Sequence, residues 1–594
     1  MSFCLSITRK ITLSIILSMI VSSQLVAQSS DQVFEQLLED HWSSNLAANP
    51  EFATSLGIRD YEELLSDPSL EAYEARIKEM ASFLQRANAI NDETLSSANQ
   101  LNKALLVLEL QTEIDAADYG GKYMIMTNRG GPHLSLTNLA SRLPFFTLQD
   151  YQSYVARLEA MPEYLSKATE RLAAGLTAGW VQPCEPMLGF EKSIQTHIVD
   201  SAADSVFIAP FDKQASKTFV EALSALKQTA EQIIENDIIP AFEVFNEFYV
   251  ERYAPACREQ VGTNGMPGGD GYYEHRVKRF TTTDLSADDV HQLGLSEVAR
   301  IRNEMLEVIK EAEFEGSFEE WLIYLRDNPD FYPKTAAQRM EQVAVISKKM
   351  DGKLPELFGK LPRMPYGLKE IPADIAEKTT TAYYQRPAGD GSRAGFYYVN
   401  TSKLETRPLY QLEALSLHEA VPGHHLQLAL AQELELPNFR KYGGITVFIE
   451  GWGLYAERLG LEVGFYETPY TNFGRLSYEM WRACRLVVDT GLHSKGWTRQ
   501  QAIDYMAKNS GLSMNNIVSE IDRYITWPGQ ALAYKIGELK IRELRERAET
   551  VLGENFDVRS FHDKILENGA LPLSILESVI DAWLRGLRER KSQN

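Results

Sequence analysis

The strongest constraint on this chain is a short segment, SLHEAVPGHHLQ, that places three of its ten histidines around a proline–glycine pair. Glu419 directly follows His418, and Pro422-Gly423 separates both residues from the pair His424-His425. Proline removes a backbone donor and clashes with the preceding turn, and glycine tolerates unusual dihedral angles. We therefore expect a helix that is broken or bulged at Val421–Gly423.

On an unbroken helix this histidine spacing is incompatible with one shared zinc ion. At about 100° per residue, His424 points roughly 240° away from His418, and His425 stands about 10 Å further along the axis. Zn–N bonds are only about 2.0–2.1 Å long, so neither pair could hold the ion. With a break, the segment reads as the zinc-peptidase motif H-E-x-x-H with two extra residues, completed by Gly423-His424.

A second motif, FIEGWGLYAE, follows at residues 448–457. Two imidazoles and one carboxylate can hold a catalytic zinc ion, with water at an open position and another carboxylate to take its proton. The second motif contains two carboxylates, Glu450 and Glu457. Glu457 lies on the same helix face as Glu450, where it either orients a ligand imidazole or makes an ordinary helix–helix hydrogen bond.

Together the two motifs resemble H-E-x-x-P-G-H-H and E-G-W-x-L-Y-x-E of a bacterial family catalogued as domain of unknown function 885. That family resembles the glutamate-zincin metallopeptidases, notably the thermostable carboxypeptidases and the thimet-type oligopeptidases. The resemblance implies one zinc ion held by His418, His424 and Glu450, with Glu419 as general base. The two extra residues depart from the oligopeptidase pattern and leave His425 as an alternative ligand.

The resemblance extends over about residues 260–540 and includes blocks that contain His493, Arg523-Tyr524 and Tyr534. It implies Tyr534 as the first candidate to stabilise an oxyanion, because related peptidases use a downstream tyrosine, with His493 as a second catalytic candidate. Arg523 and Tyr524 are candidates for substrate binding. A guanidinium pairs bidentately with a C-terminal carboxylate, which would favour carboxypeptidase or dipeptidase action. Structural packing is the alternative for each of these side chains.

Strand signals are rare and clustered just before the histidine motif. Residues Thr379–Tyr384 and Ala394–Asn400 are β-branched and aromatic and flank a Gly/Asp/Pro turn, which predicts a hairpin. By analogy with glutamate-zincins, Phe396–Asn400 would hold the substrate backbone by strand addition. Tyr398 and Asn400 are therefore candidate substrate-binding residues; a core hairpin without ligand contact is the alternative.

The remaining pattern is mainly helical, because apolar residues recur every three or four positions through most of residues 28–260. A Gly/Pro-rich stretch at residues 255–275 is the best candidate for a lobe boundary. We predict a mainly α fold: a large two-lobed helical metallopeptidase-like body with a small β-hairpin or sheet near the zinc site. An N-terminal helical lobe (residues 28–260) and a zinc-site-bearing catalytic lobe (residues 261–594) would form one continuous domain.

The N-terminus reads as a secretory signal peptide over residues 1–27. Arg9-Lys10 forms the positive region, residues 11–26 are apolar, and Leu25–Ala27 is an acceptable cleavage site. The apolar run is too short to predict a membrane anchor, which is the alternative. Cys4 precedes the apolar run, so a lipoprotein cleavage site is not expected. We predict export across the inner membrane to the periplasm, without stable membrane insertion after signal cleavage.

Charge and cysteine usage narrow the class of protein further. The first 27 residues hold one lysine, one arginine and no acid, so the mature chain has a net charge of −24, against −22 for the whole chain. This excess of acids argues against nucleic acid and anionic membranes as partners. The mature cysteines are Cys184, Cys257 and Cys484. A single bridge between Cys184 and Cys257 is compatible with this set, but disulfides are not the scaffold.

The sequence therefore predicts an exported zinc metallopeptidase of short peptides, carboxypeptidase-like or dipeptidase-like. The same site would also serve a zinc hydrolase of a non-peptide amide or ester. A non-catalytic metal-binding protein is the third alternative, but Glu419 argues against it because a structural zinc ion needs no general base.

Overall fold

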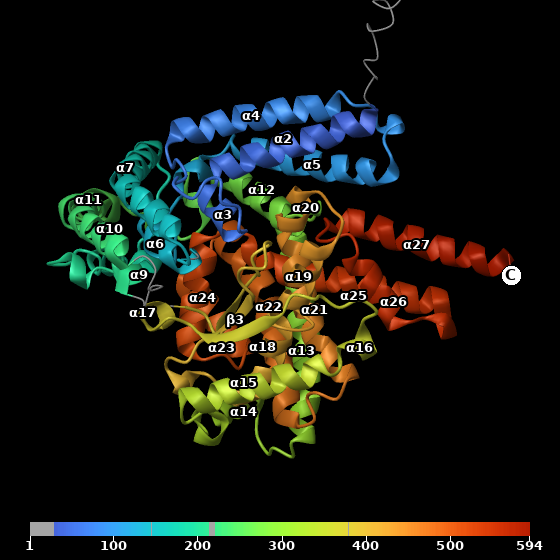
Figure 1. Cartoon of the computed structure of the whole chain (residues 1–594). Helices are drawn as coiled ribbons and strands as arrows, with labels where there is room; N and C mark the ends of the chain where they lie inside the picture. The colour runs from blue at the N-terminus through green and yellow to red at the C-terminus, as the bar shows by residue number, and fades with distance from the viewer. Residues whose placement is uncertain (1–28, 144, 213–219, 378, 594) are drawn as a thin grey trace, which may run out of the picture.

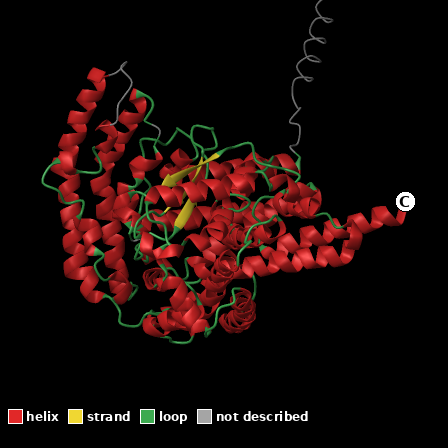
Figure 2. Ribbon diagram, turned by 90° about the horizontal axis from the view of Figure 1, so that it is seen from below, coloured by secondary structure: helices red, strands yellow, loops and turns green. Residues whose placement is uncertain are grey.

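The structure, a computed structural model, describes residues 29–143, 145–212, 220–377 and 379–593. It consists almost entirely of helices, with one small sheet (Figure 2). This confirms the predicted mainly α fold. Within the described ranges no helix is both long and apolar enough to cross a membrane. The predicted signal peptide lies outside these ranges.

The main hydrophobic core surrounds one central helix, α22 (Pro469–Ser494), which is buried on every side from Phe473 to His493. Five helices that carry or support the candidate site pack around it or on one another: α13 (Ala287–Glu311), α18 (Leu412–Glu419), α21 (Thr446–Leu459), α24 (Met514–Thr526) and α25 (Ala533–Leu552). A helix buried all round is normally apolar throughout. Charged residues nevertheless recur along α22 at spacings of three and four: Arg475, Glu479, Arg482, Arg485 and Asp489. Each has a polar partner inside the protein.

The N-terminal part divides between two cores. Three helices lie along the top of the main body in Figure 1: α2 (Ser30–Ala48), α4 (Leu70–Asn88) and α5 (Ser97–Ala116). Residues 126–253 form a separate, smaller core, which includes α7 (Leu148–Ala178), α10 (Val220–Ile233) and α11 (Ile239–Phe248). The smaller body thus ends near the expected boundary at residues 255–275, but the helices before residue 117 belong with the main body. A disulfide joins Cys184 to Cys257 at this end.

Shorter or peripheral helices complete the fold. They are α3 (Pro50–Ser55), α6 (Pro132–Thr137), α8 (Glu191–Gln195), α9 (Ala209–Asp212), α12 (Gly269–Thr281), α14 (Phe318–Asp327), α15 (Ala336–Asp351), α16 (Leu354–Leu357), α17 (Ala373–Ala376), α19 (His424–Glu433), α20 (Asn438–Tyr442), α23 (Arg499–Asn509), α26 (Val558–Leu566) and α27 (Leu573–Gln593).

The small sheet has three strands in the order β1-β3-β2: β1 (Tyr366–Glu370), β2 (Ala382–Gln385) and β3 (Gly395–Val399). The antiparallel pair β2–β3 is the predicted hairpin. Strand β1, which was not predicted, pairs parallel to β3 on its other side. Because β3 is the central strand, its backbone groups are already paired on both edges. The expected strand addition at Phe396–Asn400 is therefore wrong.

Two glycines let α21 and α25 approach each other closely. A Cβ atom at Gly451 would lie 2.5 Å from Gly537 Cα, and one at Gly537 would lie 1.9 Å from the carbonyl oxygen of Val447. Both obstacles are backbone atoms, which cannot swing aside as a side chain would. The two glycines therefore set the distance between α21, which carries Glu450, and α25, which begins with Ala533 and Tyr534.

We predict that Gly537→Ala lowers the free energy of unfolding by about 1–3 kcal/mol, because the added methyl group forces the two helices apart. Gly586→Ala on α27 is the matched control, since a Cβ atom there meets nothing within 4 Å. The control should raise stability by about 0.5–1 kcal/mol, the usual cost of a helical glycine. Chemical denaturation measures both values, and similar effects of the two substitutions would contradict the close helix contact.

Candidate metal centre

The histidine motif is split between two helices, as its spacing predicts. Helix α18 ends at Glu419 and α19 begins at His424, with a four-residue connection between them. Trp452 on α21 donates a hydrogen bond of 2.8 Å from its indole nitrogen to the carbonyl oxygen of Pro422, which fixes this connection. A Cβ atom at Gly423 would lie 1.9 Å from the carbonyl oxygen of His418. Only glycine therefore permits the chain to turn this closely against α18.

The break brings two imidazoles to one carboxylate. His418 Nε2 lies 3.5 Å, and His424 Nε2 lies 3.4 Å, from the same oxygen, Oε2 of Glu450. This oxygen is buried and has no hydrogen-bond partner in the described ranges. One potential ligand atom from each residue lies within 4.8 Å of the others. The three residues are the only described group of His, Cys, Asp and Glu side chains arranged to share a metal ion.

His425, the alternative ligand, points away from this cluster. Its Nδ1 lies 2.8 Å from the hydroxyl oxygen of Tyr384 on β2, and its ring packs 4.7 Å from that of Tyr366 on β1. Burial lowers the pKa of His425 to about 4, so it is a neutral side chain packed against the sheet. Of the two alternatives left open by the sequence, the structure brings His424 to the cluster and His425 to the sheet.

Glu457 contacts His418 at the ring nitrogen that faces away from Glu450. Its Oε1 lies 2.8 Å from His418 Nδ1 and 3.1 Å from Arg482 Nη2, and all three side chains are buried. This places Glu457 in the orienting position expected for it, and the contact fixes the ring with Nε2 toward Glu450. Gly453 makes room for the ring, because a Cβ atom there would lie 2.7 Å from a carbon of the imidazole.

Glu419 and Tyr534 border the cluster. Glu419 is the last residue of α18, and its carboxylate has no hydrogen bond within the described ranges. Burial raises the pKa of Glu419, while the neighbouring His418 lowers it. The ring of Tyr534 stacks on that of His418 with centroids 6.3 Å apart and planes 18° apart. Both residues therefore lie beside the three potential ligands, as the sequence resemblance implies.

His493, the second catalytic candidate, does not contact the three potential ligands. Its Nδ1 accepts a hydrogen bond of 3.2 Å from the backbone N–H of Thr263, and its Nε2 lies 3.0 Å from the carbonyl oxygen of Tyr524. Both ring nitrogens are thus used by the backbone, and burial lowers the pKa of His493 to about 3. The imidazole has no free nitrogen for a substrate, so we correct the expected catalytic role to a structural one.

Tyr524 and Arg523 are also held by internal partners. The hydroxyl group of Tyr524 accepts hydrogen bonds from Trp481 and Arg485 and donates one of 2.7 Å to Glu520. This fully buried tyrosine is not placed to bind substrate. Arg523 pairs with Glu520 at 2.9 Å, but it also lines an open cavity described below.

Tyr398 and Asn400, the candidate substrate-binding residues of the predicted hairpin, have different surroundings. Asn400 is fully buried, and its amide nitrogen donates to the carbonyl oxygens of Ala376, Thr379 and Thr380. It therefore fixes the loop before β2, and the expected contact with substrate is wrong. Tyr398 stacks on Tyr383 with ring centroids 4.7 Å apart, which makes it part of the sheet surface.

Two arginines of α22, which the sequence analysis did not single out, contact residues of the candidate centre. Arg482 holds Glu457, and Arg485 lies 4.1 Å from the ring centroid of Tyr534. The polar spacing of three and four along α22, a helix otherwise rich in apolar residues, is the signal that points to them.

Comparison of this chain with known proteins identifies its family and two solved structures with a similar fold. The model of a family described as bacterial protein of unknown function (DUF885) matches residues 50–580. "The putative lipoprotein from Colwellia psychrerythraea" is 29% identical, with a TM-score of 0.89 over 94% of this chain and 100% of that chain. A "putative lipoprotein of unknown function from Shewanella oneidensis" is 18% identical, with a TM-score of 0.68 over 93% of this chain and 100% of that one, and so shows the fold alone. Curated proteins gave no match.

The structural role of His493 can be tested through pH. Because its pKa is about 3 when folded and about 6.5 when unfolded, only the unfolded state gains a proton between these values. Stability due to this residue is therefore complete above pH 6.5 and falls by up to about 1.4 kcal/mol per pH unit below it. In His493→Gln this part of the slope should vanish, as measured by denaturation between pH 7 and pH 4. If instead a hydrolytic activity disappeared at unchanged neutral-pH stability, His493 would be catalytic after all.

Proposed function

This chain belongs to the bacterial family DUF885, and we propose that it is a zinc-dependent hydrolase that cleaves short peptides. One observation carries the proposal: Oε2 of Glu450, a buried oxygen that accepts no hydrogen bond within the described ranges, lies 3.4 and 3.5 Å from one nitrogen each of His424 and His418. A buried polar atom without a partner is costly, and a shared metal ion would satisfy all three atoms at once.

The spacing of these atoms suits zinc. Zinc bonds to nitrogen and oxygen are about 2.0–2.2 Å long, so neighbouring ligand atoms in a tetrahedral site lie about 3.3–3.6 Å apart. The two distances to Glu450 Oε2 agree with this value. Two histidines and one glutamate leave the fourth position open, as in catalytic zinc sites. A bound zinc ion would lower the pKa of its water to near 7 and polarise the scissile carbonyl.

The protein's own groups supply the proton transfers. Glu419 is close enough to the ligands to feel the charges of His418 and His424. As general base it would take a proton from the attacking water and deliver it to the leaving amine. Tyr534, stacked on His418, would donate its hydroxyl hydrogen to the developing oxyanion. Arg485 lies over the Tyr534 ring and lowers the pKa of that hydroxyl against the effect of burial.

A cavity that Arg523 lines supports a peptide as substrate. Its volume is about 570 Å³, within the range that takes a small ligand. Four arginines and no acidic residue line it: Arg129, Arg258, Arg276 and Arg523. Arg258 and Arg276 donate only to backbone carbonyl oxygens within the described ranges. Arg523 also lowers the pKa of Tyr534 against the effect of burial, so the charge of one cavity residue acts on this candidate oxyanion donor. This charge favours substrates with a free carboxylate, as in carboxypeptidase-like or dipeptidase-like action.

We further propose that the protein is exported to the cell envelope, in the periplasm. The predicted signal peptide, the disulfide between Cys184 and Cys257 and the lipoprotein description of the Colwellia relative support this location.

The neighbouring histidines provide a matched test of the metal site. We predict that His424→Ala lowers zinc affinity by more than about 100-fold, since it removes a ligand, and abolishes hydrolysis of a mixed peptide library. His425→Ala should keep about one zinc ion per chain, because its imidazole only packs against the sheet. Metal analysis and mass spectrometry of the digests give both readouts.

Loss of metal from the His425 variant, or its retention in the His424 variant, would refute this ligand set. If the zinc-loaded wild-type protein cleaves no peptide in the library, the peptidase function fails, and a non-peptide amide or ester becomes the better candidate substrate.

A further inference from the structure

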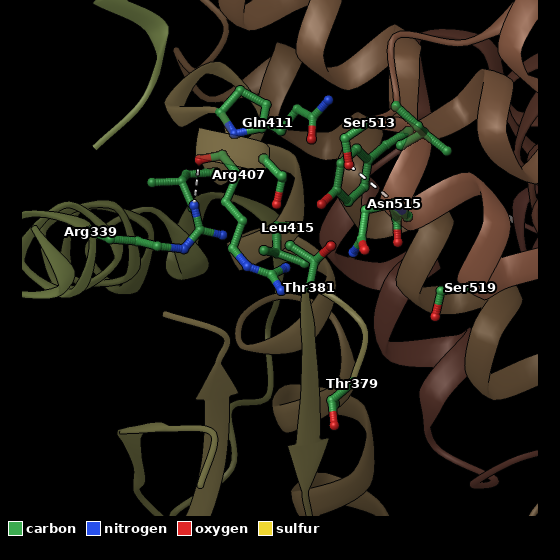
Figure 3. A pocket seen from close by; sticks show the side chains of 15 residues that line it. Arg339, Thr379, Thr381, Arg407, Gln411, Leu415, Ser513, Asn515 and Ser519 are labelled. Carbon is green, nitrogen blue, oxygen red and sulfur yellow. Dashed lines mark hydrogen bonds between the residues drawn. The ribbon is translucent and has the colours of Figure 1, made fainter. Parts of the chain in front are cut away.

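A second, smaller pocket contains two buried arginines. Arg339 comes from α15, Arg407 from the segment before η12 (Leu409–Gln411), and Figure 3 shows both side chains among the residues that line this pocket. They are only 1% and 6% exposed. The volume of the pocket is about 20 Å³, enough for a water molecule or one small anionic group.

Neither arginine has an acidic partner among the described residues. Arg339 donates one hydrogen bond, 3.0 Å long, from Nη1 to the carbonyl oxygen of Arg407, and its Nε has no partner. Arg407 donates to the backbone and hydroxyl oxygens of Ser402. Glu405 raises the pKa of Arg407 only from a distance, without an ion pair.

The two cations also act on each other. Burial, followed by the charge of Arg339, lowers the pKa of Arg407 to about 10, so the Arg407 guanidinium remains charged at neutral pH. An arginine side chain is not deprotonated in proteins, so Arg339 is a second cation beside it. Two buried like charges with no counterion are unfavourable, and a protein that keeps them normally holds an anion there.

The free edge of Arg339 has the geometry that binds a carboxylate elsewhere in this protein. Arg499 donates hydrogen bonds from Nε and Nη2 to Oδ1 and Oδ2 of Asp522, at 2.6 and 3.0 Å. In Arg339 only Nη1 donates a hydrogen bond, so this Nε–Nη2 edge is unoccupied within the described ranges. A planar carboxylate matches such an edge with two parallel hydrogen bonds.

A helix end adds positive potential on the opposite wall. Ser513 is the N-cap of α24, and both Ser513 and Asn515 line the pocket (Figure 3). The first N–H groups of a helix lack partners within the helix, and its dipole makes this end favourable for negative charge. The wall contains no acidic residue among those described.

We propose that Arg339, Arg407 and the N-terminus of α24 form a binding site for one carboxylate group. The pocket volume excludes larger anions, and the free guanidinium edge selects a flat group with two oxygens. The site is distinct from the metal centre and does not depend on the proposed hydrolase function.

The carboxylate site nevertheless lies close to Glu419. Leu412 and Leu415 line the pocket from α18, the helix that ends at Glu419. Tyr478 lines it from α22 and feels the charges of both Arg339 and Glu419. A carboxylate bound here would therefore lie within electrostatic reach of the centre.

Binding of sodium acetate to the purified protein tests the site. Ionic strength is held constant with sodium isethionate, a bulkier anion, and acetamide serves as the neutral isostere. We expect a saturable rise in melting temperature with acetate and none with acetamide. In the double variant Arg339→Met/Arg407→Met this rise should vanish, because both guanidinium groups are gone.

Arg585→Met/Arg588→Met, which removes two exposed charges from α27, is the matched control and should respond to acetate like the wild type. If the buried double variant does not fold, Arg407→Lys keeps the charge but loses the guanidinium group, and should raise the half-saturating acetate concentration about tenfold. An undiminished acetate effect in the Arg339 and Arg407 variants would overturn the site. An equal, competing effect of chloride would overturn its assignment to a carboxylate.

Two sources of the carboxylate are separable by kinetics. If the site takes the substrate's own carboxylate, Arg407→Lys raises KM for peptides with a free C-terminal carboxylate. The KM for the corresponding C-terminal amides is then unchanged. If it takes a free acid, acetate changes the rates of both peptide forms alike, and Arg407→Lys removes this effect. These kinetics require the proposed hydrolase activity, but the melting experiment does not, so failure of one is distinguishable from failure of the other.

Discussion

The hydrogen bond between His418 Nδ1 and Glu457 Oε1, 2.8 Å long, is the interaction on which the candidate centre depends. Glu457 is held in turn by Arg482, which lies on the central buried helix α22. One chain of charged contacts therefore connects α18, α21 and α22. Because it is buried, loss of Glu457 or of Arg482 would leave the other's charge uncompensated in the core. Glycines at 423, 451, 453 and 537 allow the close approaches that this arrangement requires.

The positively charged residues of the two cavities contrast with the net negative charge of the chain. The chain carries a net charge of −22, yet the 570 Å³ cavity is lined by arginines and the pocket of Arg339 and Arg407 has no acid. Buried cations are expensive unless something negative accompanies them. Arg129 and Arg523 of the larger cavity are paired with Glu520, so its uncompensated positive charge comes from Arg258 and Arg276.

The sequence predicts the centre better than its surroundings. The spacing around His418 predicts a broken helix, and the resemblance names Glu450, but the choice between His424 and His425 stayed open until the structure brought His424 to Glu450. The helix face of Glu457 left two roles open, and its hydrogen bond to His418 favours the orienting one. His493 and Asn400 failed because residue type does not show which partners occupy a polar group; here the backbone does. Strand β1 and the packing of residues 34–110 on the main core depend on contacts distant in sequence, which periodicity does not reveal.

The most direct test of the account is a comparison of the wild-type protein with Glu419→Gln, both purified, analysed for bound metal and incubated with a mixed peptide library. The account predicts that both hold one zinc ion and that hydrolysis falls by about 10²–10⁴-fold in the variant, because only the proton acceptor is lost. Unchanged hydrolysis by the variant would contradict the role of Glu419. The absence of zinc from a wild-type protein that still cleaves peptides would contradict the metal centre itself.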